Sequence, residues 1–150
     1  MTDPARPLSV RKQDTLRRLE QDVDAWVATA GADGTPYLMP LSFLWDGESL
    51  LISTAATNTT AQNLAQNPTL HLTLGPTRDV THITATADLI HATDLPPTEA
   101  EAFAAKAGFD PRQAGNPYPY FRLTPTKVQA WREVNELKTR TLMKNGTWLV

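Results

Sequence analysis

Three turn dipeptides constrain the fold of this chain more than any other feature. Asp-Gly occurs at 33–34 and 46–47, Asn-Gly occurs at 145–146, and each lies between two apolar runs. These dipeptides are typical of two-residue β-hairpin turns, because Gly adopts positive φ readily and Asp and Asn tolerate it. We therefore expect a hairpin at the C-terminal turn and a three-stranded antiparallel meander over 24–30, 36–45 and 48–54.

Pro40 falls in the middle of the second strand of this meander. Proline has no backbone N–H, so it cannot donate a hydrogen bond to a neighbouring strand. Pro40 therefore predicts an edge, a bulge or a gap in the strand pairing. A gap of this kind leaves main-chain groups of neighbouring residues free to contact a ligand.

Helical patterns occupy three further stretches, at 8–22, 58–66 and 95–108. Their termini carry capping signals: Ser9 as an N-cap, Thr98 with Glu101 as a capping box, and Gly108 as a C-terminal stop. We expect each helix to begin and end near these residues.

Strand patterns fill most of the remaining chain, at 69–75, 80–93 and 120–134, the last one interrupted by Pro125. Short strands with tight turns and few helices indicate a mostly β, α+β fold built on an antiparallel barrel. The length fits one domain over 1–150, in which residues 1–7 form a flexible arm.

The composition excludes several classes of protein. A formal net charge of -2 gives no basic surface for general nucleic-acid binding. The absence of cysteine excludes disulfides, thiolate metal sites and thiol nucleophiles. No apolar run approaches the roughly 20 residues of a membrane helix, and no apolar signal segment follows Met1. We therefore expect a cytoplasmic protein that contacts neither nucleic acid nor membrane.

No complete catalytic constellation is present in the sequence. Neither the dinucleotide fingerprint nor the P-loop pattern occurs, and no serine belongs to a triad pattern. His71, His82 and His91 fall on expected strands, where solvent-facing positions explain them better than metal ligation. An enzyme without its own nucleophile, base or metal needs a cofactor that carries the chemistry.

The segment TNTTAQNLAQNP at 57–68 is the candidate site for such a cofactor. The first N–H groups of a helix have no intrahelical partner, so a helix start is a natural anion site. Thr57, Asn58, Thr59 and Thr60 add hydroxyl and amide donors beside these N–H groups. The same residue types are the preferred N-caps, so the pattern fits a phosphate site and a simple helix cap equally well.

The order of these elements resembles the pyridoxamine 5'-phosphate oxidase-like family of FMN-binding split barrels. The similarity rests on YLMPLSF, LLIST, NLAQNP and TLHLTL, in this order within 24–93, and LGPTRDV and VQAWREVNEL extend it along the chain. The resemblance implies a six-stranded antiparallel split β-barrel with flanking helices. It also implies a homodimer that holds FMN at its interface, contacted by both chains.

The same resemblance implies a set of cofactor-binding residues. Met39, Pro40, Leu41 and Ser42 match the strand beside the isoalloxazine ring, Ser53 and Thr54 match the end of the strand that leads to the phosphate, and Asn58, Thr59 and Thr60 match the stretch that grips it. Trp131 and Arg132 match a C-terminal segment that approaches the flavin from the partner chain.

The phosphate stretch departs from the family pattern. Family members usually carry one or two Arg or Lys there, whereas this chain has Asn58, Thr59, Thr60 and Gln62. A charge-assisted hydrogen bond contributes about 1.5–3 kcal/mol, so losing two weakens binding by roughly tens-fold or more. Either the helix start and its hydroxyls suffice, or the cofactor differs or is absent, or basic residues elsewhere substitute: Arg78, Arg122, Arg132, Lys138 or Arg140.

Two classes of function follow from the resemblance. The first is an FMN-dependent oxidoreductase of an unknown small molecule, with a deazaflavin-dependent reductase of the same fold as the near alternative. The second is a non-catalytic protein that binds flavin, or binds haem through a histidine. A barrel without any ligand is the third alternative. No residue is assigned a catalytic role.

Overall fold

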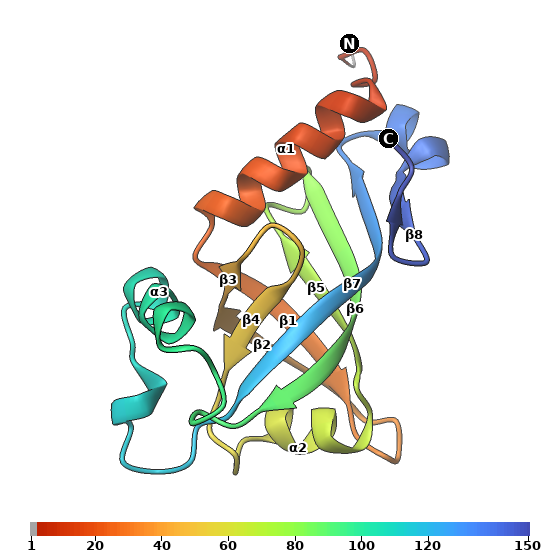
Figure 1. The fold of residues 1–150 in the computed structure, drawn as a ribbon. Helices are drawn as coiled ribbons and strands as arrows, with labels where there is room; N and C mark the ends of the chain where they lie inside the picture. The colour runs from red at the N-terminus through yellow and green to blue at the C-terminus, as the bar shows by residue number, and fades with distance from the viewer. Residues whose placement is uncertain (1–2) are drawn as a thin grey trace.

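The computed structural model describes residues 3–150, which form a twisted antiparallel sheet flanked by helices (Figure 1). Within this range the strands follow the order β2-β1-β5-β6-β7-β4-β3, with β8 and β9 attached to β7. Six of these strands form the barrel: β1 Asp24–Ala30, β2 Pro36–Ser42, β4 Leu50–Ser53, β5 Thr69–Leu74, β6 Val80–Ile90 and β7 Tyr120–Trp131. Three short strands extend it: β3 Leu44–Trp45, β8 Thr141–Lys144 and β9 Thr147–Trp148. The predicted α+β split barrel is confirmed, with these short strands added to the six expected.

Strands β2 and β4 form the two sides of the split. Their Cα atoms approach within 8 Å, but no ladder joins them within residues 3–150. β2 pairs with β1, and β4 pairs with β7 and with the short β3. The barrel wall is therefore open between these strands, and side chains from both of them can line a pocket there.

Alternate residues of each strand fill the barrel. In β1, Ala25, Val27 and Thr29 are buried, whereas Asp24 and Trp26 are exposed. This alternation has the two-residue period of a strand with one face on the core. The other strands contribute apolar residues to the same cluster, among them Leu72, Ile83, Phe121, Leu123 and Val128. The shared core fixes the register of the strands and therefore the positions of the residues at the split.

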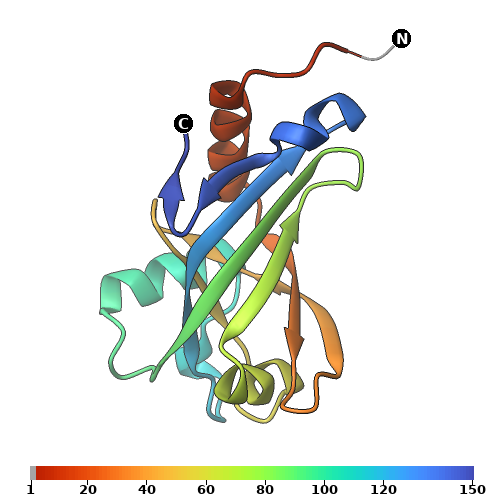
Figure 2. The same cartoon turned by 90° about the vertical axis from the view of Figure 1, so that its right-hand side faces the viewer.

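Three helices lie around the barrel in the described part of the chain. α1 (Leu8–Gln21) lies across one end, and α2 (Thr59–Gln66) lies at the opposite end, as both views show (Figures 1 and 2). α3 (Pro97–Ala107) packs beside β3. Two 3₁₀ segments, η1 (Pro111–Gln113) and η2 (Val134–Thr139), precede and follow β7. The long connection from β6 to β7 thus places α3 next to the split.

The predicted meander is correct at both turns, but its second pairing is limited to the two residues of β3. The turn at 33–34 joins β1 to β2, and the turn at 46–47 joins β3 to β4. The expected strand 36–45 is interrupted at Phe43, whose side chain is buried and whose N–H donates to the Val23 carbonyl (2.9 Å). Consequently β4 pairs on one side with only the two residues of β3, which follow this break. On its other side β4 pairs with β7, which is distant in the sequence.

The two prolines that fall in the interior of strands occupy tolerated positions. Pro40 lies on β2, which is an edge strand, as one of the predicted alternatives stated. Pro125 lies within β7, where the register against β6 shifts between Thr84 and Ala85. The bulge leaves Thr126 without a partner in the register and keeps β7 continuous from Tyr120 to Trp131.

The predicted N-terminal helix caps are wrong, whereas the predicted C-terminal stop is correct. α1 begins after Pro7 and α3 after Pro96, and no side chain caps either helix. Ser9 and the Thr98 capping box therefore do not act as caps. Gly108 ends α3 with a φ of 71°, a conformation that glycine adopts without steric cost.

Candidate functional site

A pocket of about 440 Å³ lies at the split of the barrel. Three parts of the chain line it: the paired ends of β1 and β2, the segment between β4 and α2, and the end of α3 with the loop after it. Six of the predicted cofactor-binding residues meet in this pocket: Pro40, Leu41, Ser42, Ser53, Thr54 and Asn58. Its volume lies in the range of small-molecule sites.

The hairpin register positions the β2 side of the pocket. Asp24 pairs with Ser42 at the end of the β1–β2 ladder, so their side chains lie on the same face. Ser42 Oγ donates a hydrogen bond to Asp24 Oδ1 at 2.6 Å. A carboxylate and a hydroxyl therefore form a fixed polar pair at the edge of the pocket.

The β4 side is held by side-chain hydrogen bonds to neighbouring segments. Ser53 Oγ donates to the Pro119 carbonyl at 2.9 Å, which joins the end of β4 to the loop that precedes β7. Asn58 Nδ2 donates to Thr54 Oγ1 at 2.8 Å. Because Asn58 is the N-cap residue of α2, this bond directs its amide toward β4 and not toward the first turn of the helix.

The start of α2 is consequently compatible with an anion. The helix has no side-chain cap and no acidic residue in its first turn. Its first backbone hydrogen bond runs from the Gln62 N–H to the Asn58 carbonyl (3.1 Å). In the described part of the chain, the N–H groups of Thr59, Thr60 and Ala61 have no protein acceptor. Such N–H groups carry the positive end of the helix dipole.

No Lys, Arg or His side chain lines the pocket, and Asp24 is its one carboxylate. Arg122, which sequence reasoning offered as a substitute cation, is bound to Glu99 (2.7 Å) and Asp46 (3.3 Å). The remaining substitutes of the same protomer also lie outside the lining: Arg78, Arg132, Lys138 and Arg140. Among the side chains that line the pocket, therefore, only neutral donors are available to an anion.

Aromatic side chains form the α3 side of the pocket. Phe103 is buried, Phe109 is 44% exposed, and Tyr118 is half-buried. The rings of Phe109 and Tyr118 lie 5.2 Å apart at a tilt of 59°. Tyr118 also lines a second, apolar pocket of about 260 Å³ together with Leu89 and His91. The loop between α3 and β7 thus gives the site an aromatic wall.

Five of the predicted residues do not line this pocket. Met39 is exposed on β2, Thr59 is exposed at the start of α2, and Thr60 is buried beneath it. Trp131 and Arg132 lie at the end of β7, on the side of the barrel that carries α1. Their assignment as contacts to the partner's cofactor stays a prediction.

Arg132 belongs to a cluster of charged residues at the α1 end of the barrel. Its Nε lies 3.3 Å from Asp79 Oδ2, and Asp79 also binds Arg18 of α1 (3.1 Å). The Arg140 guanidinium lies 5.7 Å from the centroid of the Trp131 ring. These contacts fix the end of β7 relative to α1.

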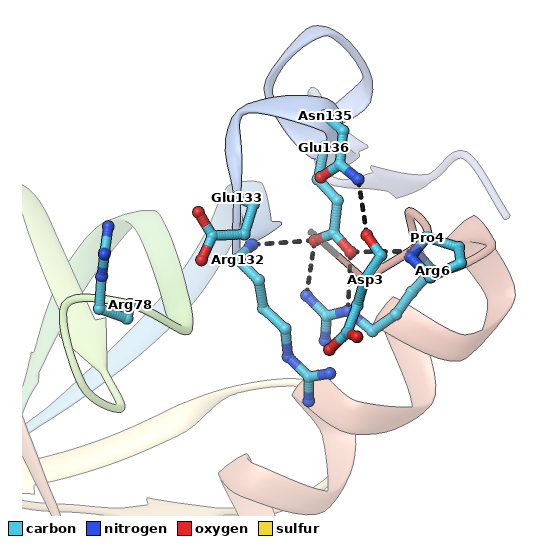
Figure 3. A pocket seen from close by; sticks show the side chains of 8 residues that line it. All are labelled: Asp3, Pro4, Arg6, Arg78, Arg132, Glu133, Asn135 and Glu136. Carbon is cyan, nitrogen blue, oxygen red and sulfur yellow. Dashed lines mark hydrogen bonds and ion pairs between the residues drawn. The ribbon is translucent and has the colours of Figure 1, made fainter. Parts of the chain in front are cut away.

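Glu136 is the most tightly bound residue of this cluster (Figure 3). Its oxygens accept from Arg6 Nη2 (2.8 Å), from Arg6 Nε (3.0 Å) and from the Arg132 N–H (2.9 Å). The Arg6 hydrogen bonds lower the pKa of Glu136 to about 2, although burial opposes this shift. The arm predicted at 1–7 is attached here through Arg6, and its residues 1 and 2 lie outside the described residues.

Arg78 borders the same cluster without joining it. It lies on the turn between β5 and β6 and lines a pocket of about 300 Å³ with Arg6, Arg132 and three acids (Figure 3). Among residues 3–150 it has no ion-pair partner. Because acids and arginines balance there, the pocket has no marked preference for anions.

Sequence reasoning missed part of the site. Asp24 was detectable only in part: the 33–34 dipeptide signals the hairpin, but a two-residue turn there would place position 24 opposite position 43, whereas the connection 31–35 pairs Asp24 with Ser42. Phe103, Ala107, Phe109 and Tyr118 gave no such signal. They reach the split only through the packing of the long β6–β7 connection, which the local pattern does not define.

The histidines form no metal centre in the described part of the chain. No group of three or more His, Cys, Asp or Glu residues there has the arrangement of a metal site. His71 and His82 stack on the outer face of the sheet, with His82 Nε2 and His71 Nδ1 3.1 Å apart. Burial lowers the pKa of His82, which favours its neutral form.

The fold and the pocket define the chain as an antiparallel split barrel with a cavity of small-molecule size at the split. The family model for pyridoxamine 5'-phosphate oxidase matches residues 13–132. The chain therefore belongs to the pyridoxamine 5'-phosphate oxidase family, and the resemblance predicted from the sequence is confirmed. No curated protein matches the chain at a significant level.

Solved structures share this fold at low sequence identity. A putative pyridoxamine 5'-phosphate oxidase from Listeria innocua has a TM-score of 0.64 and 16% identity, covering 81% of this chain and 98% of its own. An F420 reductase has a TM-score of 0.63 and 18% identity (75% and 93%). HutZ, the haem storage protein of Vibrio cholerae, has a TM-score of 0.62 and 14% identity (91% and 99%). At these identities the similarity shows the fold alone.

The helices of residues 3–150 are all too short or too polar to cross a membrane.

Proposed function

We propose that this chain is an FMN-dependent oxidoreductase of a small molecule, with the cofactor bound at the split of the barrel in a homodimer. The observation that carries the proposal is the pocket of about 440 Å³ in which six predicted cofactor-binding residues meet, three from the end of β2 and three from the β4–α2 segment. Membership of the pyridoxamine 5'-phosphate oxidase family supports a flavin as the ligand. We expect the protein in the cytoplasm.

The residues of the pocket fit the two ends of such a cofactor. Pro40, Leu41 and Ser42 would hold the ring along β2, where the edge strand offers backbone groups that no neighbouring strand uses. Asn58 and the free N–H groups at the start of α2 would hold the phosphate. Trp131 and Arg132 of the partner subunit would complete the site.

The chain itself contributes binding and orientation. FMN supplies hydride transfer when bound, which this set of side chains does not. The aromatic wall of Phe103, Phe109 and Tyr118 excludes water from one side of the pocket, and the Ser42–Asp24 pair fixes a hydrogen-bonding group at its edge. Arg and Lys are missing from the phosphate end, so we expect weaker FMN binding than in relatives that carry them.

Two other ligands define the competing functions. The F420 reductase neighbour favours a deazaflavin cofactor, which would occupy the same barrel in a reductase. The HutZ neighbour favours a non-catalytic haem protein, and His91 beside the apolar pocket of about 260 Å³ offers a ligand for that case. Neither the deazaflavin ring nor the haem ring needs a basic residue at the start of α2 in order to bind.

The experiment is a titration of the purified protein with FMN, with the deazaflavin F420 and with haem, followed by visible absorption. Saturable binding of FMN, tighter than that of the other two, supports the proposal. If F420 binds more tightly than FMN, the result favours a deazaflavin-dependent reductase. If haem binds more tightly, it favours a haem-binding protein. A protein that binds none of the three contradicts the proposal.

A further inference from the structure

We propose that the Asp24 end of the pocket binds the cationic amine of an unphosphorylated aromatic substrate. The inference deepens the proposed function, because it concerns the substrate of the same pocket. It rests on the charges and the rings that line the pocket, which no family pattern in the sequence predicted.

Asp24 has an unused hydrogen-bond acceptor at the pocket. Its Oδ1 accepts from Ser42 Oγ at 2.6 Å, whereas Oδ2 accepts from no group in residues 3–150, and no basic side chain there forms an ion pair with Asp24. The carboxylate is exposed at the edge of the pocket, where a ligand can reach it. A cation in the pocket would therefore find an oxygen already oriented by Ser42.

The basic residue that lies between the pocket residues Phe103 and Ala107 in the sequence is directed elsewhere. Lys106, on the last turn of α3, donates from Nζ to the Glu20 carbonyl at 3.0 Å and lies 5.2 Å from the centroid of the Phe43 ring. It does not line the pocket. An anionic substrate group would thus meet the Asp24 carboxylate with no compensating cation, and a second phosphate would be repelled.

The aromatic wall favours the same class of ligand. Phe109 and Tyr118 present two rings 5.2 Å apart, and Phe109 is 44% exposed at the pocket. Rings of this kind stack on an aromatic ligand and also attract a cation over their faces. A flat ring with a short aminoalkyl arm satisfies the wall and the carboxylate together.

The test uses three probes that share an indole ring and a two-carbon arm. Tryptamine ends in an ammonium, tryptophol in a hydroxyl and indole-3-propionate in a carboxylate. Each is titrated calorimetrically into the native protein, into Asp24→Asn and into Phe109→Ala, with and without saturating FMN. Asn keeps an oxygen that accepts from Ser42 and replaces the free Oδ2 with a neutral NH2 donor, so the variant removes the charge and the free acceptor but keeps the Ser42 contact. Asp88→Asn is the control, because Asp88 is an exposed strand aspartate outside the pocket.

The proposal expects tryptamine to bind about tenfold more tightly than indole-3-propionate, with tryptophol between them. Asp24→Asn should remove this order and leave tryptophol unchanged, Phe109→Ala should weaken all three probes, and Asp88→Asn should change nothing. Equal binding, preference for the anion, no binding of any probe, or an order that survives Asp24→Asn would overturn the proposal. FMN uptake is measured separately, so a charge order without FMN binding contradicts only the proposed cofactor, and FMN binding without the order contradicts only the amine.

Discussion

Asn58 occupies the N-cap position of α2, yet its side-chain amide donates to Thr54 Oγ1 at 2.8 Å and does not cap the helix. The contact has two consequences. It fixes the segment between β4 and α2, which lines the pocket, and it leaves the first N–H groups of the helix without a side-chain acceptor. Sequence alone left a helix cap and an anion site equally open, and this geometry favours the anion site.

A cation added at the start of α2 should restore the missing charge of the phosphate site. Thr59→Arg places a guanidinium on the first, exposed residue of the helix. We expect FMN to bind about ten- to hundredfold more tightly, since one charge-assisted hydrogen bond contributes about 1.5–3 kcal/mol. Fluorescence quenching of FMN measures the affinity. Ala65→Arg, at the other end of the same helix, is the control and should leave it unchanged; equal gains in both variants would show a general charge effect.

The predicted contact from the partner chain can be tested at Arg132. Arg132→Ala should weaken FMN binding by about tenfold or more if this side chain reaches the partner's cofactor. The loss of its ion pair with Asp79 should cost the fold no more than about 1 kcal/mol, because the side chain is 48% exposed. Arg17→Ala removes a similarly exposed ion-paired arginine of α1 and should leave FMN affinity intact. If Arg132→Ala and Arg17→Ala bind FMN with the same affinity, the Arg132 side chain does not contact the cofactor.

Glu136 should make the fold sensitive to acid. Its pKa is about 2 in the folded protein and 4.5 without its partners, so its stabilising effect is complete above about pH 4.5 and is lost as the pH falls toward 2. Linkage gives a contribution of up to about 3 kcal/mol at neutral pH. Glu136→Gln should lower the free energy of unfolding by about 2–3 kcal/mol at pH 7 and flatten its acid dependence, as measured by urea denaturation.

The control for this prediction is Glu133→Gln. Glu133 lines the same pocket but is exposed and forms no ion pair among residues 3–150. Glu133→Gln should lower the free energy of unfolding by less than about 0.5 kcal/mol. If the two variants have the same stability profile between pH 2 and pH 7, the Arg6–Glu136 contact does not anchor the N-terminal segment.

Gly108 should be required for the end of α3. Its φ of 71° is unfavourable for residues with a Cβ, although no atom lies within 4 Å of the position that a Cβ would take. Gly108→Ala should therefore lower the free energy of unfolding by about 1 kcal/mol through backbone strain alone, and the melting temperature should fall accordingly. Asn tolerates this conformation better, so Gly108→Asn should cost less. A melting temperature equal to that of the native protein in Gly108→Ala would contradict the assigned conformation.

Local signals in the sequence predicted the turns correctly, whereas the predicted N-terminal helix caps are wrong. Asn145, with a φ of 51°, and Gly146, with a φ of 76°, form the C-terminal turn that their residue types indicated. The pairing of β4 with β7 and the break at Phe43 depend on packing between distant segments, which no dipeptide encodes.

The site was predictable to the same extent. The pairing of Asp24 with Ser42 depends on the connection 31–35, which the turn dipeptide alone does not predict, whereas the pocket residues on β2, on β4 and at the start of α2 followed from the family pattern. The aromatic wall did not, because Phe109 and Tyr118 lie on an irregular connection that only tertiary packing positions at the split.

The central claim is that a cofactor phosphate binds at the start of α2 in the pocket at the split, and FMN titration of Asn58→Asp tests it most directly. The added carboxylate suits the helix dipole, so the fold should be at least as stable as before, but it would face the phosphate. We predict a loss of FMN affinity of about tenfold or more, with native affinity in Asn116→Asp on the exposed loop before β7. Unchanged FMN binding by Asn58→Asp would place the phosphate elsewhere and contradict the account.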